Sequence, residues 1–140
     1  MRYLIGLVIL ISITLPLSQY SKVQALIMEN SNTGQVVEEL RLRVPLRYKD
    51  AWLRAESRIW EPWLQKQKGY LGRELFYDKE KEEALVLVSW EDKKLWKSIA
   101  LEEVNRIQTI FETTLSQSLK LTTNPLQLIY EGELTRENEY

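Results

Sequence analysis

The alternation of apolar and polar residues predicts a first β-strand over residues 36–44. Along this stretch, apolar residues at even positions alternate with charged residues at odd positions: Val36, Leu40, Leu42 and Val44 against Glu39, Arg41 and Arg43. A period of two is typical of a strand that packs one face on a core and leaves a more polar face outside. Pro45 ends the strand.

Helical spacing follows over residues 47–67. Apolar residues recur at intervals of three and four, namely Trp52, Ala55, Ile59 and Trp63, widened by Leu53, Trp60 and Leu64. Pro62 lies inside this pattern, where it removes one hydrogen bond and its ring clashes with the carbonyl of Arg58. We therefore expect a break in the helix, which Gly69 then closes at its C-terminal end.

The middle of the chain predicts an antiparallel hairpin. Residues 70–78 are typical of a second strand, and the charged turn 79–83 leads into the strand 84–90. This third strand has apolar residues at both its odd and its even positions, which is typical of a central strand covered on both faces.

A second helix and a last strand complete the pattern. Asp92 caps a helix that starts at Lys93 and continues along an apolar stripe of Leu101, Val104, Ile107, Phe111 and Leu115. After a loop, residues 126–134 predict a strand with four apolar residues in phase: Leu126, Leu128, Tyr130 and Leu134.

The resulting order, β-α-β-β-α-β, is the α+β ferredoxin-like arrangement, with an antiparallel sheet and both helices on one of its faces. The other sheet face stays bare and mixes Glu39, Arg41 and Arg43 with apolar residues. A half-apolar open face favours a partner, and a second copy of the same sheet is the simplest one. We therefore expect a homodimer.

The first residues predict export. Arg2 precedes the apolar run 3–17, and Val23-Gln24-Ala25 offers signal peptidase the small residues that it accepts, so we expect cleavage after Ala25. An uncleaved membrane anchor is the alternative, although the run is shorter than the roughly 20 residues of a usual span. The predicted organisation is a signal peptide (1–25), a linker (26–34), one domain (35–135) and a tail (136–140).

The amino-acid composition limits the kinds of site and reaction that the chain can support. The remaining 115 residues are enough for one domain with its own core. The chain has a net charge of −1 and no basic stripe, which argues against nucleic acid and anionic membrane surfaces. It contains no cysteine and no histidine, which excludes disulfides, His-activated nucleophiles and His-based metal sites. Any proton transfer must use Asp, Glu, Lys or Tyr.

Several motifs resemble the dimeric α/β-barrel superfamily. They are "KGYLG" (68–72) before the second strand and "VLVSWEDKKLWKSI" (86–99) from the third strand into the second helix. This group includes antibiotic-biosynthesis-type and haem-degrading monooxygenases. "VVEELRLRV" (36–44) and "IWEPWL" (59–64) also resemble a small family found mainly in cyanobacteria. The resemblance implies a barrel dimer with a pocket beside each helix layer. Haem-degrading members use an axial histidine, which this chain lacks.

Glu56 is the candidate for chemistry. At about 100° per residue, it falls near Trp52 in the middle of the apolar arc of the first helix. A carboxylate among tryptophans has a raised pKa through desolvation unless a cation or donors keep it ionised, so Glu56 is a candidate general base. The alternative is structural: Glu56 meets Arg73 or a tyrosine hydroxyl and fixes the helix on the sheet.

The candidate ligand residues are Trp52, Trp60, Trp63, Arg73 and Tyr77. A helix break at Pro62 can open a slot walled by indole rings, which suits a flat aromatic ligand. The alternative is that the tryptophans form core, because aromatics at helical spacing more often do so. If Arg73 shares a face with Leu71, Leu75 and Tyr77, it needs an anion.

The sequence thus predicts an exported homodimer that binds a small apolar or aromatic molecule in a tryptophan-lined pocket. The alternative function is a cofactor-independent monooxygenase or isomerase with Glu56 as general base. Neither hypothesis uses a metal or a cofactor, and neither involves nucleic acid. The membrane enters only through an uncleaved N-terminal segment.

Overall fold

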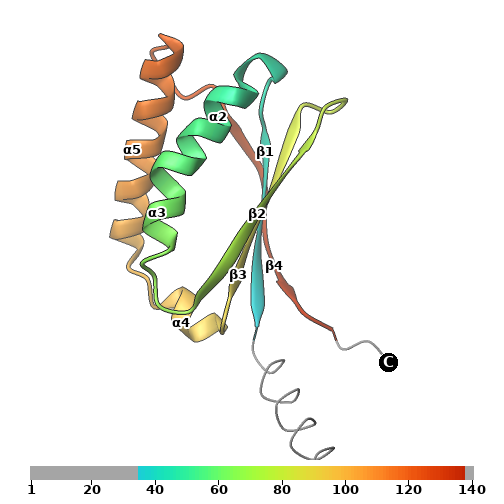
Figure 1. The fold of residues 1–140 in the computed structure, drawn as a ribbon, viewed down its shortest axis with the longest axis vertical. Coiled ribbons are helices and arrows are strands. Elements are labelled where there is room, and N and C mark those ends of the chain that lie inside the picture. The colour runs from blue at the N-terminus through green and yellow to red at the C-terminus, as the bar shows by residue number, and fades with distance from the viewer. Residues whose placement is uncertain (1–34, 138–140) are drawn as a thin grey trace, which may run out of the picture. The chain divides into compact units, whose positions relative to one another are not determined.

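The computed structural model describes residues 35–137, which form one antiparallel sheet with every helix on the same side of it (Figure 1). The strands are β1 (Val36–Arg43), β2 (Tyr70–Asp78), β3 (Glu83–Trp90) and β4 (Gln127–Thr135), in the spatial order β2-β3-β1-β4. This confirms the predicted ferredoxin-like fold. The predicted signal peptide, the linker and the last three residues of the tail lie outside the described residues.

The first helical segment is continuous and contains 3₁₀, α-helical and π-helical turns in succession. A 3₁₀ turn η1 (Leu46–Tyr48) leads into α2 (Lys49–Ala55), a π-turn η2 (Glu56–Trp60) and α3 (Glu61–Leu64). Gly69, at a φ of 83°, ends the loop after it; a Cβ there lies 2.9 Å from Leu95, so both the backbone and the space demand glycine.

The second helix, expected to be continuous, is two helices. The short α4 (Lys93–Lys97) is capped as predicted, because the Asp92 carboxylate accepts the backbone N–H of Leu95 at 2.7 Å. The chain then turns at Ala100, whose extended backbone starts α5 (Leu101–Leu119) in a new direction. This break places α4 under the sheet end and leaves α5 to pack along α2 and η2.

The core lies between the helices and the middle of the sheet. On β3 every even position from 84 to 90 is buried, and Trp52, Trp90, Leu115 and Val44 are the largest fully buried side chains. The odd positions of β3 are half-buried on the opposite face. The helix layer does not cover β4, along which eight of nine residues are exposed.

Two irregularities correct the predicted strand phases. In β2, a register shift at Leu71 puts that residue outside the phase of Arg73, Leu75 and Tyr77, and Leu71 is half exposed. In β4, a bulge at Ile129 reverses the phase, since Leu128 lies opposite Leu42 whereas Tyr130 lies opposite Arg41. The prediction that Leu128, Tyr130 and Leu134 share one face is therefore wrong, because a bulge adds one residue to one strand.

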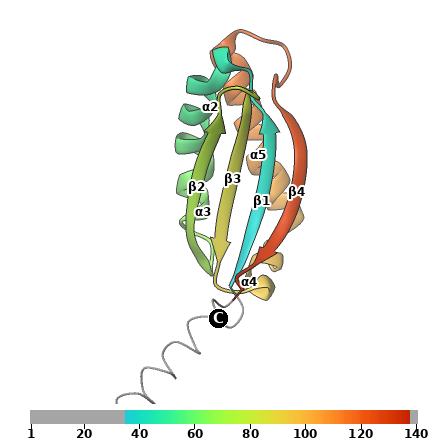
Figure 2. The ribbon, with the colours of Figure 1, turned by 90° about the vertical axis from the view of Figure 1, so that its right-hand side faces the viewer.

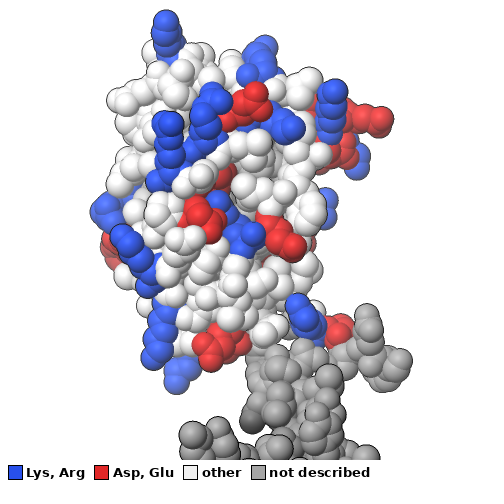
Figure 3. All heavy atoms as spheres, viewed as in Figure 1, with Lys and Arg blue, Asp and Glu red and all other residues white. Residues whose placement is uncertain are grey.

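The other face of the sheet is open (Figure 2). Register places on it the odd-numbered residues of β1 and β3 and the residues of β2 and β4 that pair with them. They include Phe76, Leu85, Leu87, Tyr130 and Leu134. Glu39 lies among them with only 7% of its surface exposed, and its carboxylate receives Arg41 Nε at 2.6 Å. Seen from the β2 edge, positive and negative side chains are interspersed over the surface (Figure 3).

Candidate functional site: a buried carboxylate network between the first helix and β2

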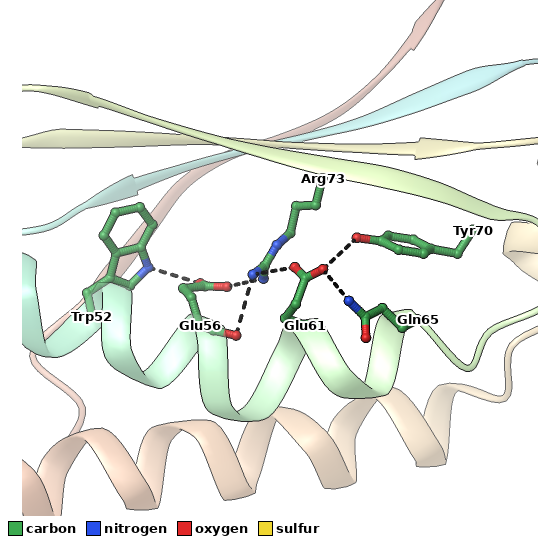
Figure 4. A network of polar contacts seen from close by, with 6 residues as sticks. All are labelled: Trp52, Glu56, Glu61, Gln65, Tyr70 and Arg73. Carbon is green, nitrogen blue, oxygen red and sulfur yellow. Dashed lines mark hydrogen bonds and ion pairs between the residues drawn. The ribbon is translucent and has the colours of Figure 1, made fainter.

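The structure brings Glu56, Trp52 and Arg73 together between the first helical segment and β2 (Figure 4). One Glu56 oxygen accepts the indole N–H of Trp52 at 2.9 Å, and the other accepts Arg73 Nη1 at 2.6 Å. The side chains of Glu56 and Arg73 are 6% and 4% exposed. Of the two structural partners considered for Glu56, Arg73 or a tyrosine hydroxyl, the structure shows Arg73.

Glu61 completes the network on the solvent side. Its carboxylate lies 2.9 Å from Arg73 Nη2, so one guanidinium joins two carboxylates. Gln65 donates to Glu61 at 3.0 Å, and the Tyr70 hydroxyl donates to it at 3.4 Å. The side chain of Glu61 is about one-third exposed, so the network runs from the core to the surface.

The π-turn η2 places the two carboxylates around the guanidinium. The backbone N–H of Glu61 donates to the carbonyl of Glu56, five residues back instead of four. Pro62 follows at once and has no N–H to continue the ordinary α-helical ladder. The carbonyl of Glu56 is also within 3.4 Å of Arg73 Nη2. The break predicted at Pro62 is therefore a π-bulge, a form often found at functional sites.

Burial governs the protonation of Glu56. Loss of hydration raises its pKa from 4.5 to about 6, and the negative charge of Glu61 adds to the rise. The Arg73 cation and the Trp52 N–H oppose it. The triad of two carboxylates and one guanidinium carries a net negative charge in a desolvated place, which is why protonation of Glu56 is favoured relative to water. At neutral pH the carboxylate is ionised and paired.

The other predicted ligand residues lie elsewhere. Trp60 and Trp63 form an edge-to-face pair with ring centres 5.5 Å apart, and Trp60 lies 6.4 Å from the ring of Phe111 on α5. The Trp63 indole N–H donates to Glu103 at 3.0 Å, also on α5. These two tryptophans thus join the two helices. Tyr77 donates to the carbonyl of Val44 at 2.9 Å, farther along β2.

A hollow of about 400 Å³ lies near the β2–β3 turn, lined by Arg41, Phe76, Tyr77, Asp78, Lys81, Glu83, Ala84 and Leu85. Of the candidate ligand residues, only Tyr77 lines it. Within residues 35–137, no group of three or more acidic side chains is arranged to hold a metal ion. None of the helices described is both long and apolar enough to cross a membrane.

The sequence analysis missed one partly buried carboxylate, that of Glu38. Glu38 occupies an even position of β1 and faces the helix layer between Val36 and Leu40. Burial raises its pKa from 4.5 to about 6, and the charge of Glu131 raises it further. The sequence could have indicated this residue, because Glu38 is a charged residue at an even position of the strand, where the other even positions are apolar.

The fold is shared with two oxygenases of known structure. A monooxygenase from the gene ActVA-Orf6 of Streptomyces coelicolor, solved with the ligand Nanaomycin D, matches with a TM-score of 0.56 and 10% sequence identity over 76% of this chain and 91% of that one. SnoaB, a cofactor-independent oxygenase from Streptomyces nogalater, matches with a TM-score of 0.50 and 14% identity over 76% and 97%.

These structures show a fold in common with a monooxygenase and a cofactor-independent oxygenase, which agrees with the fold that the resemblance implies. No protein-family model matches the chain, and no curated protein is significantly similar to it in sequence. The resemblance to a cyanobacterial family therefore stays a prediction.

Proposed function

We propose that the protein is a cofactor-independent oxygenase for a small aromatic molecule, with Glu56 as general base. The observation that carries the proposal is a carboxyl group held between helix and sheet with its pKa raised to about 6. A base is most effective when its pKa lies near the working pH. The shared fold with a cofactor-independent oxygenase supports the same reaction class.

The reaction needs no external reductant. A methylene group flanked by aromatic rings loses a proton to Glu56 and gives a stabilised carbanion, which reacts with O₂. When CH₂ becomes C=O, the substrate supplies four electrons, one oxygen atom enters the product, and the other leaves as water. Glu56 returns its proton during water loss. Arg73 stays paired and keeps the carboxyl group in place.

The test is oxygen consumption with an anthrone, an aromatic compound that has such a methylene group. We expect Glu56→Gln to lower turnover at least 100-fold, the scale of general-base catalysis. Thermal unfolding is measured alongside, because glutamine keeps an acceptor for Trp52 but turns its amide NH2 toward Arg73, which retains only Glu61 as an ion-pair partner. The matched control is Glu102→Gln, which removes an exposed carboxylate on α5, away from this network, and should leave turnover unchanged. Equal turnover of wild type and Glu56→Gln contradicts the proposal.

A non-catalytic binding protein is the second candidate. Both oxygens of the Glu56 carboxylate already have partners, Trp52 and Arg73, which favours a structural role. On this hypothesis, wild type shows no anthrone-dependent oxygen uptake, yet aromatic compounds quench its tryptophan fluorescence saturably. Loss of that quenching in Trp60→Ala or Trp63→Ala, with the fold retained, then locates the ligand.

We propose further that the open sheet face forms a homodimer. Phe76, Tyr130 and Leu134 are each more than 40% exposed on this face, and large exposed apolar patches mark interaction surfaces. Light scattering should give twice the chain mass for wild type. Phe76→Lys should give the monomer, and Leu101→Lys, which changes an exposed leucine on the helix side, should not.

Export remains part of the proposal. The N-terminal segment predicts a signal peptide cleaved after Ala25, or an uncleaved anchor. Cell fractionation followed by N-terminal sequencing distinguishes the two, since cleavage leaves Leu26 as the first residue.

A further inference from the structure

The hollow near the β2–β3 turn lies on the open face of the sheet, away from the Glu56 network. Register places Phe76, Leu85 and Arg41 in one row across the neighbouring strands β2, β3 and β1 (Figure 2). Arg73, the β2 member of the Glu56 network, pairs with the buried Val88 and therefore faces the helices. The volume of the hollow, about 400 Å³, is that of a small-molecule site.

One side of the hollow is apolar. Phe76 and Leu85 are direct neighbours across β2 and β3, and 49% of the surface of Phe76 is exposed. Tyr77 and Ala84 also line the hollow, although their side chains belong to the helix-facing side, where Ala84 is buried and the Tyr77 hydroxyl donates to Val44. These two residues therefore form the floor with their main chain, and the ring of Phe76 is available to a ligand.

Arg41 adds a cation that is held in place on one side and free on the other. Its Nε donates to the carboxylate of Glu39 at 2.6 Å, and Glu39, only 7% exposed, is fixed in the sheet face. The two Nη groups of Arg41 have no hydrogen-bond or ion-pair partner within residues 35–137. Together they form the outer edge of the guanidinium, which matches a carboxylate through two parallel hydrogen bonds.

The two acidic residues that line the hollow already have partners. Glu83 receives Arg43 Nη2 at 3.1 Å, and Asp78 lies 3.7 Å from Lys81 Nζ. The Asp78 carboxylate also accepts two backbone N–H groups of the β2–β3 turn, at 3.0 Å each. Neither carboxylate therefore occupies the free Nη groups of Arg41.

We propose that this hollow binds a small aromatic carboxylate, with its carboxylate group on the Nη edge of Arg41 and its ring against Phe76 and Leu85. An exposed ion pair alone is weak, because water solvates both charges, and the ring adds the burial of apolar surface. The site uses no residue of the Glu56 network, so this proposal and the oxygenase proposal fail or succeed separately.

The test is calorimetric titration with 2-naphthoate and, as its uncharged counterpart, 2-naphthamide. We expect saturable binding of 2-naphthoate to the wild-type protein at pH 7. Binding should be at least about tenfold weaker for 2-naphthamide and for Arg41→Gln, which lack the charge-assisted bonds, and about fivefold weaker for Phe76→Ala. The matched control is Arg54→Gln, which removes an exposed cation on α2 and should bind as wild type does.

The same face is proposed above as the homodimer interface, so the titration is repeated on Leu134→Lys. Leu134 pairs with Val37 at the opposite end of the open face, and the substitution should give the monomer without changing the hollow. Binding of 2-naphthoate to both proteins supports the site. Binding to Leu134→Lys alone also supports it and shows that a second copy covers the hollow.

A measurement without substitution at the hollow covers the case in which Arg41→Gln does not fold, since that change leaves the buried Glu39 without its cation. In ¹⁵N-labelled protein, 2-naphthoate should move the amide signals of Phe76 and Leu85 and leave the indole signal of Trp63 in place. The proposal is overturned by absence of saturable binding in both wild type and Leu134→Lys, by equal affinity for 2-naphthoate and 2-naphthamide, by equal affinity of wild type and folded Arg41→Gln, or by signal changes confined to the helices.

Discussion

Glu56 and Glu38 lie on the same side of one sheet, and burial raises the pKa of each from 4.5 to about 6, yet their surroundings differ. Glu56 is the more deeply buried and has a cation at 2.6 Å and an indole donor at 2.9 Å. Glu38 has no cation within ion-pair distance in the described part of the chain, and a second carboxylate, Glu131, lies beside it.

The comparison shows that two carboxyl groups can have the same pKa although different neighbours raise and lower it. At Glu56, a large desolvation cost is partly offset by strong partners. At Glu38, loss of hydration raises the pKa, the charge of Glu131 raises it further, and Trp90 and Lys97 lower it. Removing a neighbour should therefore have opposite consequences: at Glu56 the main neighbour is a stabilising cation, and at Glu38 it is a repelling carboxylate.

Removal of the Arg73 cation should have the largest effect. Arg73→Met leaves Glu56 buried without a counter-ion, and breaking a buried ion pair in this way costs about 3–5 kcal/mol of unfolding free energy. Urea unfolding at pH 7 measures the loss. Because protonation removes the unpaired charge, the loss should shrink at pH 4.

Arg106→Met is the control for that substitution. Arg106 pairs with Glu103 at 2.6 Å in an exposed i,i+3 arrangement, so water already solvates both charges. The unfolding midpoint of this variant should stay close to that of wild type. If Arg73→Met behaved as Arg106→Met does, the network around Glu56 would not stabilise the fold.

The charge of Glu38 should itself reduce stability at neutral pH. Its pKa is about 6 in the folded protein and 4.5 when unhindered, so the folded state binds more protons between these values. Stability from this group is complete below pH 4.5 and declines as the pH rises through about 6. Glu38→Gln removes the decline and should raise the unfolding free energy by about 1–2 kcal/mol at pH 7.

Unfolding of Glu38→Gln at pH 4 and pH 7 provides the check. At pH 4 the variant and wild type should be equally stable, since both carry a neutral side chain at residue 38. Glu74→Gln, on the exposed face of β2, controls for the general effect of removing one negative charge. A stabilisation that is the same at both pH values would contradict titration of Glu38 as the cause.

Much of the fold could be predicted from the sequence, and there is a physical reason why the remaining features could not. Alternation and helical spacing predicted the fold and the position of β2, because these depend on local periods, whereas they left Arg73 and a tyrosine hydroxyl as two possible partners of Glu56. The break at Pro62 was predicted, but its form as a π-turn was not, since it depends on where Arg73 lies in space. The β4 bulge likewise arises from pairing with β1.

Glu38 was within reach of the sequence and was missed. It occupies an even position among apolar residues, so the alternation itself assigns it to the helix-facing side. Its neighbours could not be predicted, because Glu131 and Trp90 come to its side only through the strand order β2-β3-β1-β4. A polar residue in an apolar phase therefore indicates burial, whereas its role depends on the topology.

The smallest expected effect separates the two carboxylates most directly. Glu131→Gln removes the repelling charge beside Glu38 and should lower its pKa by less than one unit, because desolvation is the larger cause. Glu61→Gln should lower the pKa of Glu56, since it removes a negative neighbour and leaves the Arg73 cation to Glu56 alone.

Carbon-detected NMR titration of the glutamate carboxyl groups follows both residues in each variant. Each substitution should move its own partner and leave the other carboxylate unchanged, because nearly the whole width of the sheet separates Glu131 from the Glu56 network. A shift of both groups in either variant would mean that the two clusters titrate as one coupled system.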